Sequence, residues 1–148
     1  ALQGIIEKNL AKEAEIKGFY LREKLIALQE KYNLVKEVRG KGLLIGLEFN
    51  QPVKGFLDML TKGKVNELAG EYLGSLVASE LMNRYPIITA YTLNNPNVIR
   101  LEPPLTVTCE AMDKVISSLE EVLEQSFAGV MVSTVGTAIR AALGHGKK

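Results

Sequence analysis

The most restrictive feature of the sequence is the strand pattern LLIGLEF at residues 43–49. Side chains in a strand alternate between two faces. One face of this strand is wholly apolar and carries Leu43, Ile45, Leu47 and Phe49. The other face carries Gly46, which leaves room for a ligand or another backbone, and Glu48, which needs a partner if it is covered. The pattern predicts a sheet with one covered face and one face open to a ligand or another part of the protein.

Helical patterns occur on both sides of this strand. Residues 2–32 and 66–84 repeat apolar side chains at spacings of three and four, and the stretch after Thr108 matches the amphipathic pattern best. Thr108 is placed to cap that last helix. Gly18 interrupts the first pattern, so we expect either a bend there or two consecutive helices.

A β-hairpin is predicted after the second helix. Residues 87–92 and 98–101 are rich in β-branched and aromatic side chains, and an Asn-Asn-Pro-Asn turn separates them. The glycines at residues 40–42 could bind phosphate, but a phosphate loop needs a longer motif that leads into a helix, and a strand follows here. We interpret them as a turn. Together the elements predict an α+β fold, with a small, largely antiparallel sheet and helices packed on one face.

The length of 148 residues fits one domain. We assign residues 1–125 to that domain and residues 126–148 to an apolar and basic extension. Eighteen Lys and Arg residues against 17 Asp and Glu residues give a net charge of +1, without a block of like charges. A nucleic-acid partner is therefore not expected.

The chain contains one cysteine, Cys109, and one histidine, His145. A single cysteine cannot form an internal disulfide. The scarcity of cysteine and histidine also argues against a zinc site and against a nucleophile activated by histidine. No signal-peptide pattern opens the chain, so we expect a cytoplasmic location. The first residue is Ala1, which suits a piece of a longer protein or the loss of an initiator Met.

Residues 127–139 are mostly small and apolar. This stretch is shorter than the roughly 20 residues that span a bilayer, so no membrane span is expected. We predict a terminal helix that docks on this domain or on a partner subunit, with a helix lying on a membrane surface as the weaker alternative.

Arg100 is the strongest candidate for ligand binding. In the strand at residues 98–101, Ile99 and Leu101 share the core face, so Arg100 points the opposite way. A guanidinium on a rigid strand suits a bidentate contact with a carboxylate. The alternatives are an exposed arginine, or one paired internally with Glu48 or Glu102.

Three segments together resemble the C-terminal small domain of the class III aminotransferases, the ornithine, acetylornithine and putrescine group. They are YLREKL at residues 20–25, VRGKGLLIGLEF at residues 38–49 and VIRLEPPLT at residues 98–106. The resemblance covers about residues 1–125.

The resemblance implies transfer of an amino group from an amine or ω-amino acid to a keto acid, with pyridoxal 5'-phosphate as cofactor. It also implies that Arg100 binds a substrate carboxylate. The large domain of the family, which supplies the cofactor lysine, has no counterpart in this sequence. We therefore expect no catalytic, cofactor-binding or metal-binding residue here, no cofactor on this chain, and no activity without the large domain as partner.

Two other functions stay open. The chain could be a separate module that binds a carboxylate through Arg100. It could also be an oligomerisation module whose contact is the apolar stretch at residues 127–139. For the chain in general we expect a homo-oligomer.

Overall fold

The fold of the chain comes from a computed structural model, which describes residues 2–50 and 64–124. Four antiparallel strands form one sheet in the order β1-β2-β4-β3. The strands are β1 (Val35–Lys41), β2 (Leu44–Phe49), β3 (Ala90–Tyr91) and β4 (Val98–Leu101). The predicted α+β fold with a small antiparallel sheet is confirmed.

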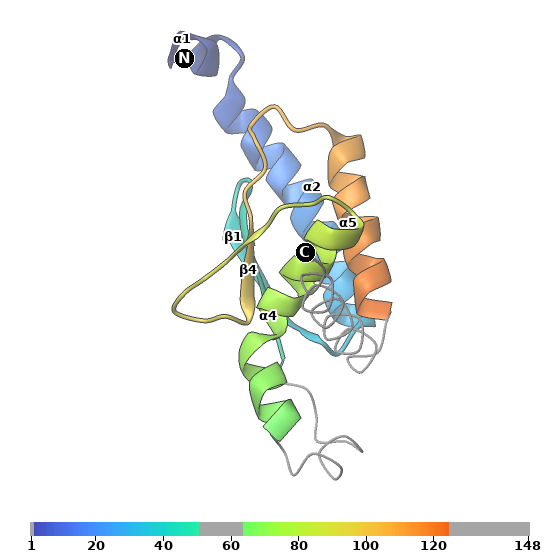
Figure 1. Cartoon of the computed structure of the whole chain (residues 1–148). Helices are drawn as coiled ribbons and strands as arrows, with labels where there is room; N and C mark the ends of the chain where they lie inside the picture. Colours follow the sequence, from blue (N-terminus) through green and yellow to red (C-terminus); the bar gives the residue numbers. More distant parts are fainter. Residues whose placement is uncertain (1, 51–63, 125–148) are drawn as a thin grey trace, which may run out of the picture.

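Helices α2 (Leu10–Lys31), α4 (Lys64–Arg84) and α5 (Cys109–Glu124) lie on one side of this sheet (Figure 1). Helix α1 (Leu2–Glu7) lies beyond the end of α2, which it contacts. Helix α2 contacts β1 and β2, and α4 contacts the other strands. Helix α5 packs against α2 and α4. The second face of the sheet is therefore left without a covering helix among the described residues.

The core lies between the sheet and the helices. The strand β2 buries its apolar face as predicted, with Ile45 and Leu47 at most 1% exposed. The amphipathic pattern of α5 is also confirmed, since its apolar stripe joins the same core. That stripe consists of Met112, Leu119, Val122 and Leu123. Thr108 caps α5 as predicted, because its Oγ1 accepts a hydrogen bond from the backbone N–H of Ala111.

Strand β1 was not predicted from the sequence. It pairs with β2 in an antiparallel hairpin, and the chain turns at Gly42 and Leu43. The interpretation of residues 40–42 as a turn is therefore correct only for Gly42, because Gly40 and Lys41 belong to β1, and the strand itself was missed. The reason is its composition, because most of its side chains are charged and exposed.

The break in the first helical region lies at Asn9 and not at Gly18. Asn9 has a left-handed backbone, with φ 46°, and separates α1 from α2. Two consecutive helices are present, but the prediction that Gly18 interrupts the helical region, by a bend or by a break, is wrong. Gly18 lies inside α2 and faces Gly42, where a Cβ would overlap the turn backbone. The glycine permits close packing of α2 on the hairpin.

The predicted hairpin of residues 87–101 is confirmed, but its first strand is shorter than expected. Only Ala90 and Tyr91 pair with β4. The backbone N–H of Ile87 donates to the carbonyl oxygen of Leu81 near the end of α4. The start of this segment therefore bonds to the helix and not to β4.

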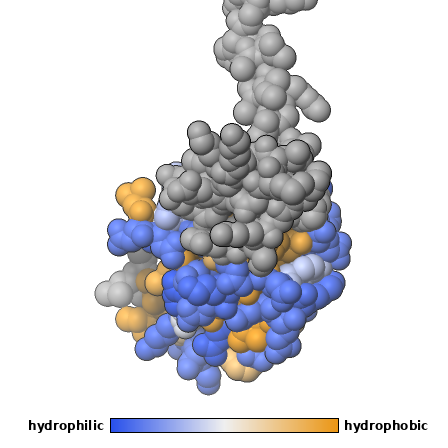
Figure 2. Space-filling view, turned by 90° about the horizontal axis from the view of Figure 1, so that it is seen from below, coloured by the Kyte–Doolittle hydropathy of each residue, from blue (hydrophilic) through white to orange (hydrophobic). Residues whose placement is uncertain are grey.

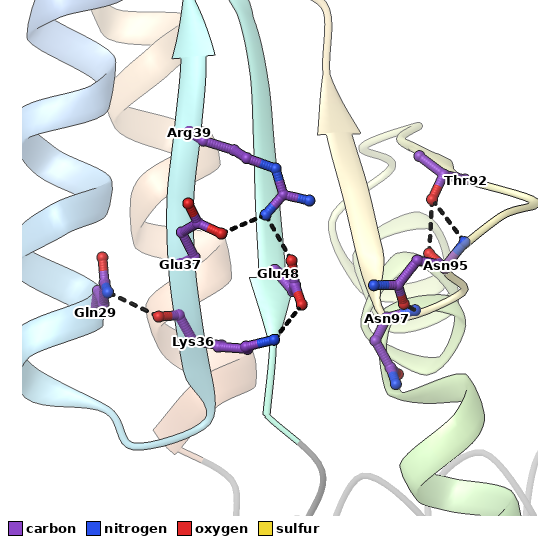
Figure 3. Close-up of polar contacts among 8 residues, drawn as sticks. All are labelled: Gln29, Lys36, Glu37, Arg39, Glu48, Thr92, Asn95 and Asn97. Atoms are coloured by element: carbon purple, nitrogen blue, oxygen red, sulfur yellow. Dashed lines mark hydrogen bonds and ion pairs between the residues drawn. The ribbon is translucent and has the colours of Figure 1, made fainter.

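The hairpin turn is anchored to α4 by Asn97, which is 9% exposed. Its Oδ1 accepts hydrogen bonds from the backbone N–H groups of Leu73, at 2.8 Å, and Gly74, at 3.4 Å. A Cβ at Gly74 would overlap the backbone of the turn. Within the turn, Thr92 and Asn95 bond to each other, and Asn95 bonds to the Asn97 backbone (Figure 3).

Helix α5 is held by three similar polar contacts at its surface. In each, a tyrosine hydroxyl of α2, or just after α2 or α4, donates to a carboxylate of α5. The pairs are Tyr20 with Asp113 at 2.6 Å, Tyr85 with Glu121 at 2.8 Å and Tyr32 with Glu124 at 3.1 Å. A lysine or arginine lies over each tyrosine ring. The contacts join α5 to both neighbouring helices.

Some predictions fall outside the described residues. One of these is the docking helix at residues 127–139. In the part of the chain that is described, no helix has the length and apolarity needed to cross a bilayer.

Candidate functional site

The candidate site is the sheet face opposite the helices. The pairing register places Arg39 on β1, Gly46 on β2, Arg100 on β4 and Ala90 on β3 side by side in one row. Directly opposed residues in a sheet share a face. Two arginines therefore flank a glycine, so no side chain rises from β2 at this point of the row, and Val98 and Arg39 are the side chains that a Cβ there would contact.

Arg100 points away from the core, as predicted. Its neighbours Ile99 and Leu101 are 0% and 5% exposed, whereas the Arg100 side chain is 47% exposed. Its Nη1 lies 3.4 Å from Oε1 of Glu102, whose side chain is 45% exposed. Pairs of this kind contribute little free energy, since water screens both charges. The guanidinium is thus paired with Glu102, one of the two expected alternatives, and not with Glu48.

Glu48 lies on the same face, on β2, and is only 8% exposed. Its carboxylate accepts hydrogen bonds from Lys36 Nζ at 2.7 Å and Arg39 Nη1 at 2.5 Å (Figure 3). These two contacts lower the pKa of Glu48 below its ordinary value. The prediction that a covered Glu48 needs partners is confirmed.

The two arginines of the row have different surroundings. Arg39 Nη1 also contacts Oε2 of Glu37 at 2.7 Å, so Arg39 bridges two carboxylates. Arg100 makes one longer contact to a half-exposed carboxylate. A ligand carboxylate can therefore displace the partner of Arg100 more easily than those of Arg39.

The partners of Glu48 were missed by sequence reasoning. Lys36 and Arg39 lie on β1, the strand that the sequence did not predict. The signal for β1 was its basic residues, because opposite charges pair across strands. In a hairpin with β2 they would lie close to Glu48.

A cavity of about 260 Å³ lies beyond the end of β4. Its walls are apolar apart from Glu102 and Thr89, and they include Pro103, Val107 and Met112. The Thr89 hydroxyl is buried and has no hydrogen-bond partner among the described residues. A cavity of this composition suits the aliphatic part of a small molecule better than a charged group.

No described cluster of three or more His, Cys, Asp and Glu side chains could hold a metal ion. Cys109 is free and exposed at the first position of α5.

A family model of the class III aminotransferases matches residues 1–123 of this sequence. The chain belongs to the class III aminotransferases. It is 30% identical over 127 residues to an uncharacterized aminotransferase of Schizosaccharomyces pombe, covering 85% of this chain and 24% of that protein.

Solved structures agree with this class III assignment. A transaminase solved with L-alanine is 26% identical, with a TM-score of 0.65, over 88% of this chain and 27% of that one. A Bacillus anthracis aminotransferase is 25% identical, with a TM-score of 0.62, over 83% and 26%. The chain thus spans about a quarter of the length of these relatives.

Membership of the class III aminotransferases implies pyridoxal phosphate as the cofactor of the full-length enzymes. A lysine that forms a Schiff base is activated by burial or by a neighbouring cation. Every lysine whose side chain the structure describes is exposed or half-buried. Those lysines therefore do not fit the covalent cofactor site.

Proposed function

We propose that this chain is the C-terminal lobe of a class III aminotransferase, which closes over the substrate and contacts its carboxylate through Arg100. The enzyme transfers an amino group from an amine or ω-amino acid to a keto acid. The chain is inactive without the large domain, which provides the cofactor lysine. Residues 1–125 form the lobe, residues 126–148 an extension, and the enzyme acts in the cytoplasm as a homo-oligomer.

The orientation of Arg100 carries this proposal. A bidentate contact requires a guanidinium with a fixed direction and an accessible edge. The buried neighbours Ile99 and Leu101 fix the strand, and the missing side chain at Gly46 leaves space beside it.

The proposal is tested by titrating the chain with 2-oxoglutarate and following the side-chain N–H signal of Arg100 by NMR. One half-exposed arginine is expected to bind a carboxylate weakly, with a dissociation constant on the order of 10 to 100 mM. Arg100→Gln is expected to remove the saturable signal. Arg84→Gln is the matched control, because Arg84 is similarly exposed but pairs with Glu80 on α4.

Two results would contradict the proposal. In one, 2-oxoglutarate binds Arg100→Gln as well as it binds the unchanged protein, which would place the carboxylate elsewhere. In the other, the isolated chain with added pyridoxal phosphate transfers amino groups, which would remove the need for a large domain.

A further inference from the structure

Hydrophilic side chains dominate the coloured part of the face that Figure 2 shows, and apolar ones reach it only at separate places. Several charged side chains of the described fold are neutralised by a neighbour. On α2, for example, Lys17, Lys24 and Lys31 each form an ion pair with a glutamate or an aspartate. A cavity whose basic side chains lack such a partner is therefore a candidate site for an anion.

Such a cavity lies between α2 and the turn of the β1–β2 hairpin. It has a volume of about 190 Å³, and its walls include Arg22 of α2 and Lys41 of β1. Among the described residues, no carboxylate forms an ion pair with either side chain. Arg22 is half-buried, so water and salt screen its charge less than that of a fully exposed arginine.

Glycines make room for this cavity. Gly18 of α2 and both glycines of the hairpin, Gly40 and Gly42, line it. Gly42 has a φ of 54°, a backbone conformation that other residues rarely adopt. Because no side chain leaves these three positions, the wall of the cavity there is main chain and the space in front of it stays open to a ligand.

The cavity is separate from the row of residues that contains Arg100. Gly40 pairs with Ile45, whose side chain is in the core. Directly opposed residues share a face, so Gly40 lies on the helix side of the sheet, whereas Arg100 lies on the other side. A ligand in this cavity therefore does not depend on the proposed aminotransferase function.

We propose that this cavity binds a small phosphate ligand, either inorganic phosphate or a phosphate monoester. A phosphate group carries a charge of about −1.5 to −2 at pH 7, which matches two cations better than the single charge of a carboxylate does. Arginine binds phosphate oxygens through two parallel N–H groups, and lysine adds a point charge. Arg22 and Lys41 hold the ligand through their side chains, unlike a phosphate loop, which uses its backbone.

The size of the cavity limits the ligand. A volume of about 190 Å³ equals that of roughly six water molecules, which suits a phosphate group with at most a small substituent. One acidic residue, Glu15, also lines the cavity. It lies two turns before Arg22 on α2, which is roughly 10 Å along the helix axis. At that distance in salt solution, its charge weakens phosphate binding by only about twofold.

Titration of the chain with inorganic phosphate, followed by amide NMR at constant ionic strength, tests the proposal. Saturable shifts are expected at Gly18, Gly40 and Gly42, with a dissociation constant on the order of 1 to 10 mM. Acetate is expected to bind about tenfold more weakly, because it carries less charge. Methyl phosphate distinguishes the two sources: equal affinity identifies a monoester as a ligand, and weaker binding identifies free phosphate.

Three substitutions in the cavity have different expected effects on the dissociation constant. Arg22→Gln is expected to weaken phosphate binding about tenfold or more, because it removes charge-assisted hydrogen bonds. Lys41→Gln, at an exposed position, is expected to weaken it about two- to fivefold. Glu15→Gln is expected to strengthen it about twofold. Lys114→Gln is the matched control, because Lys114 of α5 is exposed and has no ion pair among the described residues, but lies outside the cavity.

Four results would each overturn the proposal. Phosphate causes no saturable shift at the three glycines, acetate binds as tightly as phosphate, Lys114→Gln weakens binding as much as Lys41→Gln does, or Arg22→Gln binds phosphate as tightly as the unchanged chain. Circular dichroism checks that Arg22→Gln is folded. If it is not, the opposite effects of Lys41→Gln and Glu15→Gln decide, since both positions are exposed.

Discussion

Substitution of Gly18 by alanine measures how closely α2 packs on the β1–β2 hairpin. A Cβ at position 18 would overlap the backbone oxygen, carbonyl carbon and Cα of Gly42. Backbone atoms cannot rotate away as a side chain can, so helix and hairpin must separate. Overpacking costs about 1 to 3 kcal/mol, and three overlapped backbone atoms place this site near the upper end. Alanine offsets about 1 kcal/mol through its better helix propensity, which leaves a net loss of about 2 kcal/mol.

The assay is unfolding in urea, followed by circular dichroism. Gly18→Ala is expected to lower the midpoint while the slope stays unchanged. Gly4→Ala in α1 is the matched control, since no heavy atom lies within 4 Å of its added Cβ. That control is expected to keep or raise the stability. If Gly18→Ala were as stable as the unchanged protein, the close packing of α2 on the hairpin would be refuted.

Two further predictions concern polar groups with low exposure. Asn97→Ala leaves the Leu73 N–H without its acceptor, so a loss of about 1 to 3 kcal/mol in unfolding free energy is expected; a change within error in urea would contradict this role. Glu48 has a pKa below its ordinary value of 4.5, so its contribution to stability is complete above that pH and is lost as the pH falls through the lower folded pKa. Glu48→Gln is therefore expected to destabilise the protein at neutral pH and to weaken the fall of the melting temperature below pH 4.5, and equal acid sensitivity in both proteins would argue against it.

The sequence was sufficient for the parts of the fold in which periodicity and burial agree. The alternation in β2 and the apolar stripe of α5 both follow from one buried face, and the direction of Arg100 follows from Ile99 and Leu101. The predicted Glu48 partnership rests on the same alternation.

Features set by tertiary contacts could not be predicted in this way. Strand β1 has few buried side chains, and its pairing with β2 holds it in the sheet. Gly18 reads as a helix break, but its position against Gly42 keeps it inside α2. Asn9 provides the break instead, through a left-handed conformation that composition does not reveal. Which carboxylate pairs with Arg100 depends on how far the side chains extend along β4, and the alternation of faces alone does not determine that.

The tyrosine contacts of α5 have a mechanical consequence for the described fold. Tyr20, Tyr32 and Tyr85 bind carboxylates spread along the length of α5, and they come from both flanking helices. Tilting any one helix would have to drag the others and the strands beneath them. If Arg100 approaches a substrate carboxylate as proposed, we therefore expect the sheet and its helices to move together as one body.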